Sequence, residues 1–133
     1  MKTETKNKLI RTGGIFSGLF LILHVGFYWI FRWGQTLQVM NPTDKAILLT
    51  LNLAGILFLI YTSGVSFLLT KQLSQTTTGR SILLFFASFY LLRIAAEFLF
   101  FGFAMPKSIV AVLLCLIPAV CYLLAAIPKP ENN

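Results

Sequence analysis

Residues 81–102 read SILLFFASFYLLRIAAEFLFFG, an apolar run in which Arg93 and Glu97 are the two charged residues. A membrane helix needs about 20 mainly apolar residues to cross about 30 Å of hydrocarbon, and this run is long enough. A charged side chain at the centre of such a helix costs about 2.5–3.5 kcal/mol on insertion scales. The stretch therefore predicts a membrane-spanning helix whose two charged side chains contact groups that stabilise them.

The composition extends this interpretation to the whole chain of 133 residues. Hydrophobic residues make up 57% and charged residues 11% of the chain, and the mean hydropathy is +0.82. A soluble domain carries about 25% charged residues. Four stretches are long enough to span a membrane, at residues 10–32, 43–70, 81–103 and 107–127. We expect one all-α domain over residues 1–133, with four transmembrane helices in an up-down-up-down antiparallel bundle and no separate catalytic domain.

Lysine and arginine are unevenly distributed over this expected topology. With the N-terminus in the cytoplasm, the cytoplasmic side carries Lys2, Lys6, Lys8, Arg11, Lys71, Arg80 and Lys129, and the other side carries Arg32, Lys45 and Lys107. Because cytoplasmic segments are enriched in cations, both termini are expected on the cytoplasmic side of a cytoplasmic-type cell membrane. The same bias explains the net charge of +7. The cations are attracted to anionic lipid and form no folded basic face, so nucleic-acid binding is not expected.

Four strongly polar side chains fall at similar expected depths. With a rise of 1.5 Å per residue, Arg93 lies about 18 Å above the inner edge of the membrane, and His24, Asn52 and Glu97 lie about 21–24 Å above it. Helical periodicity places Tyr90 on the face of Arg93 and Glu97. We expect these residues to form one cluster. In it, Arg93 would contact an anion or a carboxylate, Glu97 would be the counter-ion and proton carrier, His24 a titratable partner and Asn52 an orienting hydrogen-bonding group.

Three classes of function fit this polar layer. The first is binding or transport of a small molecule or an ion. The second is a structural or assembly subunit of a membrane complex or homo-oligomer, in which Arg93 and Glu97 neutralise each other and the layer only joins helices. The third is a membrane enzyme that acts on a lipid or a quinone. Access of water to Glu97 separates the first class from the second, and a chemical product would be needed for the third.

Residues for metal or cofactor chemistry are sparse in this sequence. It contains one histidine and four acidic residues, and Glu97 is the one acid that we expect to be buried. Cys115 and Cys121 are six positions apart, about 120° out of register on one helix, so they do not form a redox pair. Haem ligation by an axial pair within the chain would require a second histidine. We therefore expect no catalytic residue, cofactor or metal site, and no motif specifies the ligand.

Overall fold

The computed structural model describes residues 1–103 and 106–128, and these form an all-α structure. The helices are α1 (Thr3–Ile30), α2 (Trp33–Val39), α3 (Pro42–Leu68), α4 (Thr70–Gln75), α5 (Thr77–Leu99) and α6 (Lys107–Ala126). Four of them, α1, α3, α5 and α6, are long and apolar enough to cross a membrane. The expected all-α bundle is thus confirmed. The tail from Lys129 and the turn at residues 104–105 lie outside the described residues.

The helices begin and end at positions that differ from the apolar stretches. Helix α1 begins at Thr3 rather than at residue 10, because a helix continues through polar residues that leave the hydrocarbon. Helix α5 begins at Thr77, where the Thr76 side chain accepts a hydrogen bond from the Gly79 amide at 2.9 Å. It ends at Leu99 rather than at residue 103, and the chain turns through Gly102 with a positive φ of 65°.

The start of α3 follows the sequence signal closely. Asn41 precedes Pro42, and its side chain accepts a hydrogen bond from the backbone amide of Asp44 at 2.8 Å. Proline at the first helical position and an acid in the first turn both favour a helix start here. Two short helices, α2 and α4, occupy the connectors on either side of α3, which hydropathy alone did not indicate.

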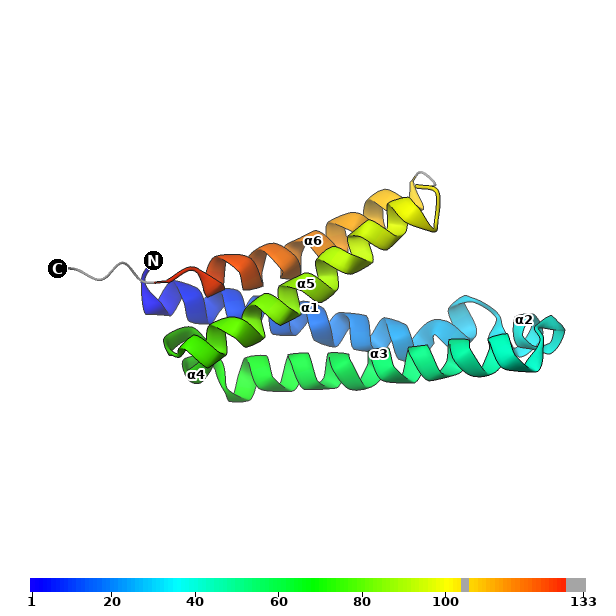
Figure 1. The fold of residues 1–133 in the computed structure, drawn as a ribbon, viewed down its shortest axis with the longest axis horizontal. Coiled ribbons are helices and arrows are strands. Elements are labelled where there is room, and N and C mark those ends of the chain that lie inside the picture. Colours follow the sequence, from blue (N-terminus) through cyan, green and yellow to red (C-terminus); the bar gives the residue numbers. More distant parts are fainter. Residues whose placement is uncertain (104–105, 129–133) are drawn as a thin grey trace.

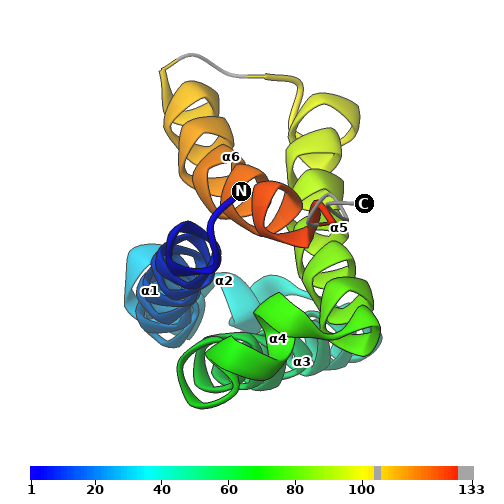
Figure 2. The same cartoon turned by 90° about the vertical axis from the view of Figure 1, so that its left-hand side faces the viewer.

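The four long helices form two hairpins. Helices α1 and α3 lie side by side along most of their length, and α5 and α6 form the second pair (Figure 1). The hairpins meet where α6 packs against α1, at the end that holds the N-terminus, and they diverge toward the other end (Figures 1 and 2). The end that holds the N-terminus, where the hairpins meet, is called the basal end. The end at which they diverge is called the outer end.

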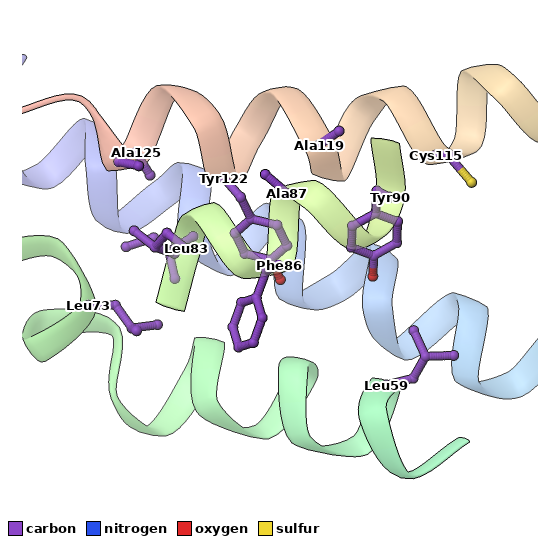
Figure 3. Packing of buried hydrophobic residues seen from close by; sticks show 12 residues of the cluster. Leu59, Leu73, Leu83, Phe86, Ala87, Tyr90, Cys115, Ala119, Tyr122 and Ala125 are labelled. Atoms are coloured by element: carbon purple, nitrogen blue, oxygen red, sulfur yellow. The ribbon is translucent and has the colours of Figure 1, made fainter. Parts of the chain in front are cut away.

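The core lies where the two hairpins meet. Tyr122 of α6 and Phe86 and Tyr90 of α5 pack there with small residues such as Ala87 and Ala119 (Figure 3). Their buried rings stack or meet edge to face, with centroid separations of 5.4–6.3 Å. The core therefore depends on aromatic side chains from the second hairpin.

A glycine of α1 makes room for this core. A Cβ atom added at Gly13 would lie 2.5 Å from Cζ of Tyr122, which no ordinary side-chain contact allows. The absence of a side chain at Gly13 thus lets α6 approach α1 closely, as small residues do at helix interfaces in membranes.

Large apolar side chains cover the outside of the bundle. Leu68 and Phe100 are each 82% exposed, and Ile22 and Leu99 are exposed nearly as much. Such a surface is unfavourable in water and suits the hydrocarbon of a lipid bilayer. Together with the four apolar helices, it identifies the chain as a membrane protein.

Candidate functional site

Arg93 and Glu97 form the expected ion pair near the outer end of α5. The Arg93 Nη1 donates a hydrogen bond of 2.8 Å to the Glu97 Oε2. The Ser108 hydroxyl of α6 donates another, of 2.7 Å, to the Glu97 Oε1. Both carboxylate oxygens are thus bound by the protein, and the Glu97 side chain is 9% exposed. Glu97 joins α5 to α6 and is the anchored member of the pair.

Arg93 is held less completely than Glu97. Its side chain is 40% exposed, and its guanidinium lies 5.0 Å from the centre of the Phe101 ring, in a cation–π contact. A guanidinium carries five N–H donors. Within residues 1–103 and 106–128, the bond to Glu97 is the one side-chain hydrogen bond that Arg93 makes. Arg93 therefore retains donors for an additional acceptor.

His24 and Asn52 form a second polar pair, on the other hairpin. The His24 Nδ1 lies 3.0 Å from the Asn52 Oδ1, and the Asn52 amide donates to the backbone oxygen of His24 at 3.4 Å. Because an amide oxygen only accepts hydrogen bonds, Nδ1 of His24 must carry the proton. The other ring nitrogen, Nε2, makes no hydrogen bond to any of the described residues. It is therefore the atom of this pair that is free to meet a ligand.

The two pairs occupy the outer half of the bundle but lie on different hairpins. Counted from the outer helix ends at 1.5 Å per residue, Glu97 lies about 3 Å in, Arg93 and His24 about 9 Å, and Asn52 about 15 Å. No hydrogen bond joins the pairs in the described part of the chain. The single cluster expected from depth is therefore divided in two, because the hairpins diverge at this end.

Tyr90, which helical periodicity groups with Arg93, lies in a different polar centre. Its hydroxyl is 2.6 Å from the Ser17 Oγ, and the Tyr122 hydroxyl lies 3.2 Å from Ser17 and 2.9 Å from the Ser66 Oγ. All four residues are at most 2% exposed, and they come from α5, α1, α6 and α3. This hydroxyl network joins the four long helices at the core.

Sequence reasoning missed Ser66 and Tyr122 as members of this network. Hydroxyls are common in apolar helices and carry no charge, so neither residue interrupts the hydropathy pattern. Tyr122 is, however, the one tyrosine in the apolar stretch at residues 107–127, and it faces the small-residue stripe of Gly13 and Ser17. That combination was the available signal.

The described residues bring no three His, Cys, Asp or Glu side chains together in a way that could hold a metal ion. Comparisons with protein-family models, with curated proteins and with solved structures found no match to this chain. The functional interpretation therefore rests on the two polar pairs and on the chemistry of their free donors and acceptors.

Proposed function

We propose that this protein binds a small molecule with an anionic group, in a role related to transport across or along the membrane, and that the outer polar pairs are its binding site. Arg93 would contact the carboxylate or other anionic group of the ligand, with Glu97 as its fixed counter-ion. His24 would approach the ligand from the other hairpin through Nε2, oriented by Asn52.

The observation that carries this proposal is the state of Arg93. Within the described part of the chain its guanidinium makes one hydrogen bond, to Glu97, and its side chain is 40% exposed on a membrane helix. A charge near hydrocarbon is costly unless further partners stabilise it. A carboxylate is the partner that fits a guanidinium best, since it accepts two parallel N–H bonds. An anionic ligand would complete the coordination of Arg93.

The position of Glu97 fits a supporting role. Ser108 and Arg93 already bind its two oxygens, so it has little capacity for a ligand of its own. Its hydrogen bond to Nη1 holds the guanidinium of Arg93 in place when the site is empty. A single added anion would then face a pre-oriented guanidinium, which reduces the entropy cost of binding.

A second candidate function, that of an assembly subunit, is favoured by the contacts of Glu97 with Arg93 and Ser108. Glu97 links α5 to α6 through Ser108, as a polar group that only joins helices would do. In that case the exposed apolar faces would contact other subunits or a second copy of this chain. The two candidates differ in whether the charge of Arg93 is needed for anything beyond folding.

We also propose that the N-terminus and the C-terminus both lie on the cytoplasmic side of a cytoplasmic-type cell membrane. The Lys6 ammonium donates a hydrogen bond to the backbone oxygen of Ile127, which supports a common side for the start of α1 and the end of α6. Lys2, Lys8 and Arg80 belong to the same basal end, in accord with the enrichment of cations in cytoplasmic segments.

The binding proposal is tested with the purified full-length protein and two carboxylates, oleate as a long one and benzoate as a short one. Binding to the folded state raises the melting temperature in detergent. At least one carboxylate should raise it for the wild type and for the control Lys45→Gln, which removes an exposed cation of α3, but not for Arg93→Gln. Oleyl alcohol, which lacks the charge, should have no such effect. An equal response of Arg93→Gln and wild type would favour the assembly subunit.

A further inference from the structure

A polar pocket of about 470 Å³ lies at the basal end, away from the outer polar pairs. Its walls come from the start of α1, from α4, from the start of α5 and from the segment that follows α6. Its lining includes Lys6, Ser74, Thr76, Thr77 and Arg80. Figure 2 looks onto this end of the bundle, with the N-terminus, α4 and the end of α6 facing the viewer. The volume is in the range of small-molecule sites.

Two cations line this pocket, and each retains hydrogen-bonding capacity. Lys6 is only 5% exposed, and its ammonium donates one hydrogen bond, to the backbone oxygen of Ile127. An ammonium has three donors, so two remain. The Nε of Arg80 is buried, and no acceptor for it is found within the part of the chain that the structure describes. A buried donor without an acceptor is unfavourable, and a small shift of the Arg80 side chain toward a ligand oxygen in the pocket would remove that cost.

The positive charges of Lys6 and Arg80 repel each other. The described residues around the pocket include no aspartate or glutamate that would offset this repulsion. The first residue of α5, Thr77, and the residue that caps it, Thr76, also face the pocket. The N-terminus of a long helix carries partial positive charge, which adds to the field of the two cations. All of these contributions favour an anion.

The depth of the pocket corresponds to the headgroup region of a bilayer. Helix α1 has 28 residues, which amount to about 42 Å and exceed the hydrocarbon thickness of about 30 Å. The apolar stretch of α1 starts at residue 10, so Lys6 lies about one turn outside it. Arg80 likewise lies directly before the apolar stretch of α5, which starts at residue 81. At this level the most abundant anionic group in a membrane is phosphate.

We propose that the pocket between Lys6 and Arg80 binds a phosphate group, either the headgroup of an anionic phospholipid or free phosphate. Lys6 provides a compact charge, Arg80 donates through its guanidinium, and the Thr77 hydroxyl supplies a neutral donor. The site is independent of the outer polar pairs and of any ligand bound there.

The experiment measures the melting temperature of the full-length protein in a neutral detergent as each of three probes is added. The probes are short-chain phosphatidylglycerol, short-chain phosphatidylcholine and inorganic phosphate. Phosphatidylglycerol should stabilise the wild type more than phosphatidylcholine if the ligand is an anionic lipid. Stabilisation by inorganic phosphate as well would assign the site to free phosphate or to any accessible phosphate group. Addition of salt should weaken either effect.

Arg80→Gln should weaken binding of the stabilising probe by about tenfold or more, because a charge-assisted hydrogen bond is lost. Lys6→Gln should do the same, and Arg80→Gln keeps the test valid if Lys6→Gln, which also loses the bond to Ile127, fails to fold. The matched control is Arg11→Gln, which removes an exposed cation of α1 that does not line the pocket. The proposal is overturned if neither phosphatidylglycerol nor phosphate stabilises the wild type, or if Arg80→Gln binds as well as Arg11→Gln.

Discussion

The Tyr90 hydroxyl and the Ser17 Oγ lie 2.6 Å apart at the point where α5 of one hairpin meets α1 of the other. The Ser17 hydroxyl donates its hydrogen to the Gly13 backbone oxygen at 2.9 Å. Ser17 therefore accepts from Tyr90, since a serine hydroxyl has a single hydrogen to donate. Every hydroxyl of this buried centre has a partner, which is the condition under which a buried polar network stabilises a fold.

Removal of the Tyr90 hydroxyl should destabilise the bundle. In Tyr90→Phe the Ser17 oxygen loses the hydrogen bond that it accepts at the contact between the hairpins. We expect the free energy of unfolding to fall by about 0.6 kcal/mol and by no more than about 1.7 kcal/mol, the average and the maximum for interhelical hydrogen bonds in a membrane protein. Thermal unfolding of the variant and the wild type in detergent measures this loss of stability. The control is Tyr61→Phe, which removes a hydroxyl from an exposed ring of α3. Equal melting temperatures for the two variants would contradict a stabilising role for the network.

Gly13→Ala should be destabilising although alanine is the better helix former. The added Cβ would lie 2.5 Å from the buried ring of Tyr122, and such overpacking costs about 1–3 kcal/mol. Gly64→Ala in α3 is the matched control, because a Cβ there meets nothing within 4 Å. That control should be neutral or stabilising by up to about 1 kcal/mol. A Gly13→Ala protein as stable as Gly64→Ala would show that α6 does not approach α1 as closely as described.

The ion pair of α5 should respond differently to single and double substitution. Glu97→Gln leaves the Arg93 charge without its counter-ion. We expect a loss on the order of 2 kcal/mol, less than the ~3–5 kcal/mol for a fully buried pair because Arg93 is 40% exposed. The double variant Arg93→Leu with Glu97→Leu should be nearly as stable as the wild type, since no unpaired charge remains. Melting temperatures of the three proteins in detergent give this comparison.

The double variant also separates the two candidate functions. If the pair binds a ligand, a folded and inserted double variant should lose the stabilisation by carboxylates that the wild type gains. If the pair only joins helices, the double variant should keep any phenotype that the protein has in its host. A stable double variant with full native activity would therefore argue against a binding role for Arg93 and Glu97.

Reporter fusions should place both termini on the cytoplasmic side. A fluorescent protein that folds only in the cytoplasm should be active at either end. A phosphatase that needs export should be active when fused after Lys45, in the first turn of α3. The reason is the enrichment of cations at the basal end. Phosphatase activity at the N-terminus would reverse the proposed orientation.

The sequence by itself determined the membrane class, the four spans and several local features. Apolar runs of sufficient length predict spanning helices whatever their neighbours are. The start of α3 at Pro42 and the pairing of Arg93 with Glu97 depend on residues within one turn of each other, so helix geometry is enough to predict them. The extension of α1 to Thr3 was missed because hydropathy locates the hydrocarbon and not the ends of the helix.

The tertiary structure decided which polar residues meet. Depth and helical periodicity place His24 and Arg93 in the same half of the membrane, but the divergence of the hairpins assigns them to separate pairs. The contact of Tyr122 with Ser17, and the pocket between Lys6 and Arg80, depend on how two helices rotate and cross. Those angles follow from the packing of all facing side chains at once, as at Gly13, and no single stretch of sequence specifies them.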